Sequence, residues 1–149
     1  MANIRETDAI LHVLRCFDDD NITHVDGTVN PVRDKEIIDF ELQLKDLETI
    51  ESRISKVQKQ AQTGGDKAAK VTYEVLSRYK EALEQGKAAR TVAFETKDEQ
   101  KIAHDLFLLT NKPVMYVCNV DDNSAVSGNK YVDMVREAVK DENAEILIL

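Results

Sequence analysis

The chain has 149 residues, with 20 Lys and Arg against 28 Asp and Glu, a net charge of −8, and 42% hydrophobic residues. This composition suits one soluble domain or two small lobes, and it excludes a Pro/Gly-rich disordered chain and a membrane span of roughly 20 apolar residues. Without a signal peptide, a cytoplasmic protein is expected. The two cysteines lie in separate apolar runs, so we expect buried thiols rather than a disulfide framework or a metal site.

Residues 7–17 form the first predicted element, a β-strand. The run is almost continuously apolar and rich in Ile, Leu and Val. Such runs are typical of strands that are covered on both faces in a parallel sheet. A parallel strand needs partners from elsewhere in the chain, and the connection to them is usually helical.

Residues 33–86 contain no strand-like run and predict two long antiparallel helices. In the first helix, apolar residues recur at spacings of three and four, which indicates a narrow coiled-coil-like seam. Gly64 and Gly65 supply a reversal, and Gly86 supplies a stop after the second helix. The predicted seam comprises Ile37, Phe40, Leu44, Leu47, Ile50, Ile54, Val57 and Ala61.

The outer half of this predicted arm differs in charge from the rest of the chain. Residues 52–80 contain seven Lys or Arg and two acids, a net charge of +5, whereas the remaining sequence has a net charge of −13. This asymmetry favours a surface that faces a polyanion, although Lys and Arg on a solvated helix can also serve solubility alone. The predicted contact residues are Arg53, Lys56, Lys59, Lys67 and Lys70.

The rest of the sequence predicts a helix, a strand, a second helix and a last strand. Thr96 and Glu99 have the spacing of a capping box at the start of the first of these helices. Apolar strands follow at residues 113–120 and 144–149, and residues 130–142 between them place apolar side chains on one helical face. The predicted fold class is therefore α/β, with parallel strands and a long antiparallel helical insertion.

The loop after the strand at residues 113–120 is the predicted base-binding site. An open α/β sheet binds its ligand beyond the carboxyl ends of its strands, and this strand leads into Asn119, Val120 and Asp122. An Asn amide can pair with the N6 donor and N7 acceptor of adenine. Asn and Asp also stabilise turns without any ligand, so the pattern alone leaves both interpretations open.

Motifs along essentially the whole chain resemble the YchF/Obg-like ATPases, a family of Obg-related P-loop nucleotidases. The matching motifs include ANIRETDAI at residues 2–10, DNITHV at 20–25, VNP at 29–31, KVQK at 56–59, GGDK at 64–67, LLT at 108–110 and YVDMVR at 131–136. The resemblance implies a partial Ras-like domain in residues 1–32 and 92–149, and a coiled-coil arm in residues 33–91. In the family, the P-loop and switches precede the equivalent of residue 2. Since the chain contains no G-x-x-x-x-G-K-[ST] motif, we expect an internal fragment of a longer protein.

The resemblance also bears on the base loop. Asn119 and Asp122 match the first and last positions of the Asn-Lys-x-Asp motif of Ras-like proteins, whereas this family usually has Asn-x-x-Glu and prefers ATP. Val120 in place of the motif's Lys argues against ordinary GTPase behaviour. Asp122 in place of Glu leaves the choice between ATP and GTP open.

The resemblance implies that the longer protein hydrolyses ATP or GTP with Mg²⁺ and contacts the ribosome or RNA through its arm. This chain lacks the groups that position phosphates, so we expect in it no catalytic residue, no metal ligand and no tightly bound nucleotide. The alternative is a free-standing nucleic-acid or protein interaction module without nucleotide hydrolysis. Because a sheet of three strands leaves edges and apolar faces bare, we also expect self-association.

Overall fold

The computed structural model describes residues 8–17, 29–62, 66–121 and 128–149, which belong to two compact units. The helical unit contains Asp39–Lys112, and the sheet unit contains Asp8–Ile38 and Pro113–Leu149. Helix α2 (Pro31–Gln62) begins in the sheet unit and continues without a break into the helical unit. The predicted α/β class with a long helical hairpin is confirmed, while the domain boundaries at residues 32 and 92 stay a prediction.

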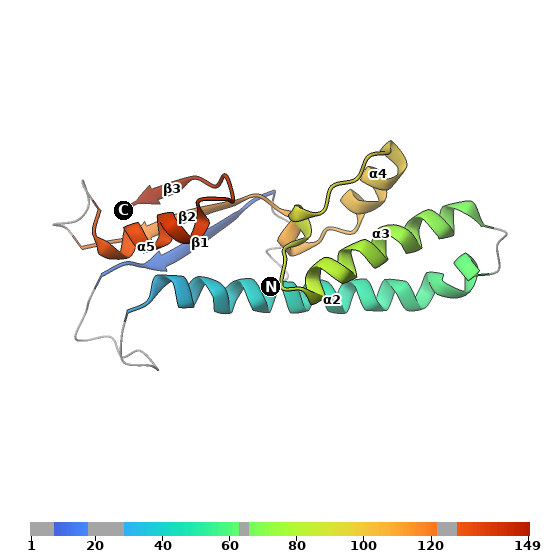
Figure 1. Ribbon diagram of the computed structural model, residues 1–149, viewed down its shortest axis with the longest axis horizontal. Helices are drawn as coiled ribbons and strands as arrows, with labels where there is room; N and C mark the ends of the chain where they lie inside the picture. Colours follow the sequence, from blue (N-terminus) through green and yellow to red (C-terminus); the bar gives the residue numbers. More distant parts are fainter. Residues whose placement is uncertain (1–7, 18–28, 63–65, 122–127) are drawn as a thin grey trace. The chain divides into compact units, whose positions relative to one another are not determined.

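The sheet unit is built on three parallel strands in the order β1, β2, β3 (Figure 1). Strand β1 spans Ile10–Arg15, β2 spans Val114–Asn119 and β3 spans Ile146–Ile148. Helix α5 (Lys130–Val139) connects β2 to β3. All three predicted strands and the strand, helix, strand unit are therefore confirmed.

Helix α5 covers one face of the sheet. The core on this face contains Leu14, Cys16, Tyr116, Cys118, Val132, Val135 and Val139. On the opposite face of β1, Leu11 and Val13 are 64% and 62% exposed. The prediction that this strand is covered on both faces is wrong for β1, because an apolar run sets the propensity for a strand but does not itself supply a second covering layer.

The helical unit contains the outer part of α2 and the antiparallel helix α3 (Lys67–Glu84), which lie side by side in Figure 1. It continues with the short 3₁₀ helix η1 (Ala89–Thr91), helix α4 (Lys97–Asp105) and the 3₁₀ helix η2 (Leu109–Asn111). Its core includes Ile50, Val75, Leu76, Tyr79 and Leu83, with Leu47, Ile54 and Val57 packed against them. The outer members of the predicted seam therefore do pack in the hairpin.

The inner part of the predicted seam does not pack in the hairpin. Its first three members, Ile37, Phe40 and Leu44, are 57%, 61% and 45% exposed. Here α2 instead buries Leu42 and Asp46, which precede the buried seam residue Ile50 at intervals of four along one face of the helix. The seam prediction is wrong in this region, because it followed the apolar residues and left out a buried carboxylate.

Local signals set the helix boundaries where the sequence indicates them. The Thr96 side chain accepts from the Glu99 backbone amide, and the Glu99 side chain reaches back to the Thr96 amide, so the predicted capping box is confirmed. Gly86 follows α3 with φ of 77°, a conformation that glycine adopts at little cost. Within the described ranges, no helix combines the length and apolarity that a membrane crossing requires.

Candidate functional site

The carboxyl edge of the sheet places Asn119 where a base-binding residue is predicted. Asn119 is the last residue of β2 and is exposed. Its carbonyl accepts a hydrogen bond of 2.8 Å from the amide of Cys16, which fixes the backbone. Its side-chain amide makes no hydrogen bond with any described residue. The backbone is thus held while the amide can still pair with a ligand.

The two other predicted loop residues differ from Asn119. The Val120 amide donates to the Leu149 carbonyl at 2.8 Å, and the Val120 side chain packs against the cluster under α5. A contact between Val120 and a base therefore has to use its carbonyl or side chain. Asp122 lies outside the described residues.

Asn129, at the far end of the same loop, was missed by the sequence analysis. Its side-chain oxygen caps α5 by accepting from the amides of Tyr131 and Val132, while its Nδ2 donates to the Cys16 carbonyl at 2.7 Å. Gly128 before it has φ of 79°, which glycine tolerates best. A Gly-Asn pair ahead of an amphipathic helix is a capping signal that could have identified this residue.

The two cysteines lie beneath this edge. Both thiols are buried, as predicted, and both are free. A hydrogen bond with Cys118 and burial raise the pKa of the Cys16 thiol well above its usual range. The same hydrogen bond with Cys16 lowers the pKa of the Cys118 thiol. Both thiols are fully buried, so reagents at the edge do not reach them.

The five predicted contact cations lie toward the end of the α2–α3 hairpin. Arg53, Lys56 and Lys59 come from the last turns of α2, and Lys67 and Lys70 from the first turn of α3. All five are exposed, and within the ranges that the structure describes none has an ion-pair partner. The Asp66 carboxylate caps the N-terminus of α3 by accepting from the Ala69 amide, so this helix end adds no net positive charge beside Lys67 and Lys70.

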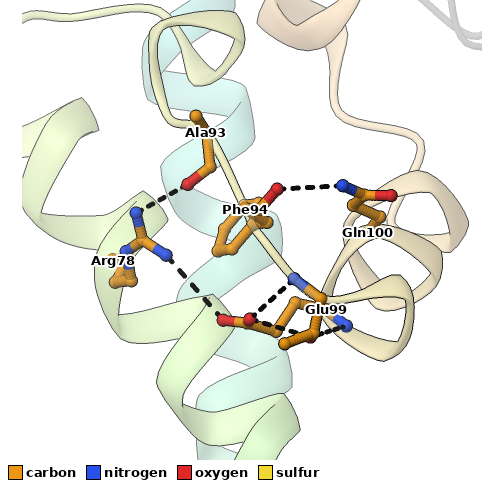
Figure 2. Close-up of polar contacts among 6 residues, drawn as sticks. Arg78, Ala93, Phe94, Glu99 and Gln100 are labelled. Carbon is orange, nitrogen blue, oxygen red and sulfur yellow. Dashed lines mark hydrogen bonds and ion pairs between the residues drawn. The ribbon is translucent and has the colours of Figure 1, made fainter.

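Arg78 and Lys80 belong to the same basic stretch but are engaged within the unit. Figure 2 shows Arg78 reaching the Ala93 carbonyl at 2.7 Å and the Glu99 carboxylate at 3.8 Å. Its guanidinium also lies 4.5 Å from the ring centroid of Phe94. Lys80 pairs with Glu84 at 3.8 Å. These two cations therefore have partners within the unit, which separates them from the five predicted contact residues.

The groove between α2 and α3 has a different character from the basic surface. It has a volume of about 590 Å³, and the charged residues that line it are Glu51, Lys80, Glu81 and Glu84. Three acids disfavour a polyanion there. Of these two described parts of the hairpin, the one with the five exposed cations therefore suits a polyanion better.

Asp46 is a buried functional group that the sequence analysis did not single out. Its carboxylate accepts hydrogen bonds from the amides of Leu109 and Thr110, both at 2.7 Å, and from the Thr110 hydroxyl at 2.6 Å. That hydroxyl also accepts from the Ala89 amide at 2.8 Å. Asp46 is fully buried, so α2 is fixed to η1 and η2 by charge-assisted hydrogen bonds.

Comparison with known proteins places the whole chain in one group of relatives. It is 48% identical over 151 residues to "Ribosome-binding ATPase YchF" of Bacillus subtilis, covering 100% of this chain and 41% of the relative. It is 44% identical over 147 residues to the protein of that name from Escherichia coli O157:H7, covering 99% and 40%. "Obg-like ATPase 1" of Caenorhabditis elegans is 35% identical over 150 residues, covering 100% and 38%. This chain belongs to the YchF/Obg-like ATPase family.

The fold of this YchF-like chain agrees with the sequence comparison. The solved "Structure of the Schizosaccharomyces pombe YchF GTPase" superposes with a TM-score of 0.86 at 29% identity, covering 99% of this chain and 41% of that one. No family model matches the sequence. The YchF-like chain thus spans about two fifths of the length of the relatives it matches.

Proposed function

We propose that this chain supplies a base-recognition loop and an RNA-contacting arm to a ribosome-binding ATPase. The observation that carries the proposal is the group of five exposed cations, without described partners, on the hairpin of a chain that resembles ribosome-binding relatives. Exposed Lys and Arg bind phosphates by displacing counterions from the nucleic acid. The RNA-contacting residues are Arg53, Lys56, Lys59, Lys67 and Lys70.

The base loop consists of Asn119, Val120 and Asp122. The Asn119 backbone is held by its bond with Cys16, and its exposed side-chain amide suits the adenine edge, which supports ATP as the nucleotide. Curated relatives are named ATPases while the solved relative is named a GTPase. Phosphate positioning, Mg²⁺ and hydrolysis then belong to parts of the longer, cytoplasmic protein other than this chain.

An RNA-binding titration with matched charge reversals tests the arm. The arm variant carries Lys56→Glu, Lys59→Glu and Lys70→Glu, and the control carries Lys87→Glu, Lys97→Glu and Lys101→Glu. All six lysines are exposed, so both variants change net charge equally. Fluorescence anisotropy with a ribosomal RNA fragment should show at least about tenfold weaker binding for the arm variant only. Equal weakening in both variants would mean that net charge, not the arm, governs binding.

Titration of nucleotide into this chain tests the loop. Calorimetry with ATP and GTP, each with Mg²⁺, should show no tight binding, because phosphate contacts supply most of the affinity in such sites. Selective ATP binding that Asn119→Ala abolishes would instead give the loop a complete pocket of its own. RNA binding by the arm together with no nucleotide effect in the longer protein would favour the alternative, an interaction module without hydrolysis.

Self-association is a further part of the proposal. The exposed Leu11, Val13 and Leu147 leave apolar area bare on one face of the sheet. Light scattering of concentrated protein should therefore show dimers or larger species. A clean monomer at high concentration would contradict this expectation.

A further inference from the structure

Three side chains from separate elements of the sheet unit meet on the face under α5. The Lys35 ammonium of α2 lies 3.2 Å from Oε2 of Glu142, which follows α5. The Tyr116 hydroxyl of β2 donates to Oε1 of the same carboxylate at 2.7 Å. The Lys35 ammonium also lies 5.5 Å from the centroid of the Tyr116 ring. Glu142 therefore bridges α2 and β2.

The bridge is largely withdrawn from water. Tyr116 is fully buried and Lys35 is 8% exposed, whereas the side chain of Glu142 is 26% exposed. A lysine is rarely buried unless it is paired, and removing one partner of a buried pair leaves a costly charge behind. The contact therefore constrains α2 more strongly than an exposed ion pair would.

The position of Lys35 along α2 matters as much as its burial. The next three residues, Glu36, Ile37 and Ile38, are all exposed. Lys35 is thus the last buried residue of α2 before the helix continues into the helical unit. From there the same unbroken helix runs on to Arg53, Lys56 and Lys59.

Tyr116 connects the same contact to strand β2. It lies three residues before Asn119 in β2, so a shift or local opening of this part of β2 moves the residue proposed to meet the base. We infer that Lys35, Glu142 and Tyr116 form a joint that couples the base-binding strand to the arm helix. The inference rests on the proposed function for its two ends, the base loop and the arm. The joint itself is a property of this unit and can be tested separately.

Hydrogen exchange without any ligand tests the joint. Glu142→Gln keeps an acceptor for the Tyr116 hydroxyl but removes the charge that holds Lys35. The joint predicts that exchange rises together, by about threefold or more, in the first turns of α2 and in Val114–Asn119. A rise near residue 142 alone, with both α2 and β2 unchanged, would overturn it.

Hydrogen exchange with RNA bound tests the coupling to the arm. In wild type, an RNA duplex of about 20 base pairs should slow exchange in residues 53–70 and also in Val114–Asn119. Lys35→Met should keep the first effect and lose the second. Lys45→Met, on the same helix, should keep both. Protection of β2 that survives Lys35→Met, or that is absent from wild type with bound RNA, would overturn the coupling.

The two tests separate the inference from the proposed function. If RNA does not bind at all, the RNA-contacting role of the arm fails, while the ligand-free exchange experiment still decides whether the joint exists. If RNA binds and the joint is absent, the proposed function stands without this coupling. Circular dichroism of Lys35→Met and Glu142→Gln verifies that both variants are folded.

Discussion

Two charged side chains hold helix α2, and they do so by different chemistry. In the helical unit, Asp46 is fully buried and accepts from two backbone amides and a hydroxyl at 2.6 to 2.7 Å. In the sheet unit, Lys35 pairs at 3.2 Å with a carboxylate that is partly exposed. Backbone donors cannot change rotamer, whereas a side-chain pair can part and reform. Asp46 therefore fixes the helix, and Lys35 is its adjustable attachment.

Replacing Asp46 should give the largest loss of stability. Asp46→Ala leaves the amides of Leu109 and Thr110 without these hydrogen bonds in a buried place, and a cost of about 3–5 kcal/mol is expected. Chemical denaturation monitored by circular dichroism measures it. Glu48→Ala, which removes an exposed acid from the same helix, is the control and should cost less than about 0.5 kcal/mol. Similar costs for Asp46→Ala and Glu48→Ala would mean that the Asp46 carboxylate does not fix the helix.

The loss of stability should depend on which partner of the Lys35–Glu142 pair is removed. Lys35→Met replaces the charge by an apolar side chain of similar length, so the free energy of unfolding should change by about 1 kcal/mol or less. Glu142→Ala should cost more, because it leaves the Lys35 ammonium and the Tyr116 hydroxyl without this partner. Denaturation curves of the two variants measure the difference. A larger cost for Lys35→Met would mean that Lys35 acts chiefly through packing.

A third expected effect is confined to alkaline pH and sharpens the account of the helical core. Burial raises the pKa of Tyr79 to about 12 from its ordinary value of 10.0. The unfolded chain therefore releases this proton first, so Tyr79 stabilises the fold fully below pH 10 and loses that contribution as the pH rises to 12. Tyr79→Phe should flatten this part of the curve of unfolding free energy against pH, measured by denaturation between about pH 9 and 12. Curves of equal slope for wild type and Tyr79→Phe would contradict the burial of the hydroxyl.

Much of the fold follows from local patterns, which explains why the sequence predicts it. Apolar runs give the three strands, and Thr96 with Glu99 gives the start of α4. The covering of each strand depends on other parts of the molecule, so the exposure of Leu11 and Val13 could not be predicted from the run itself.

The buried charges were harder to predict. Asp46 had a signal, because it lies between Leu42 and Ile50 at helical spacing, but a polar residue on a buried face is usually taken as a break in the pattern. Lys35 and Glu142 meet across more than a hundred residues, and no spacing rule describes such a contact. In the predicted base loop, Asn119 is proposed from its place after a strand, and its role stays a prediction. The contact of Asn129 with the Cys16 carbonyl joins distant parts of the chain and follows from no local pattern.

The salt dependence of RNA binding tests the central claim, that the exposed cations of the hairpin contact RNA phosphates. Affinity for an RNA duplex should fall steeply between about 50 and 200 mM salt, and a contact made by five cations predicts a slope of log affinity against log salt of about −4 to −5. Reversing the charge of Arg53, Lys56, Lys59, Lys67 and Lys70 should bring that slope close to zero. A shallow slope in wild type, or an unchanged steep slope in the variant, would contradict the claim.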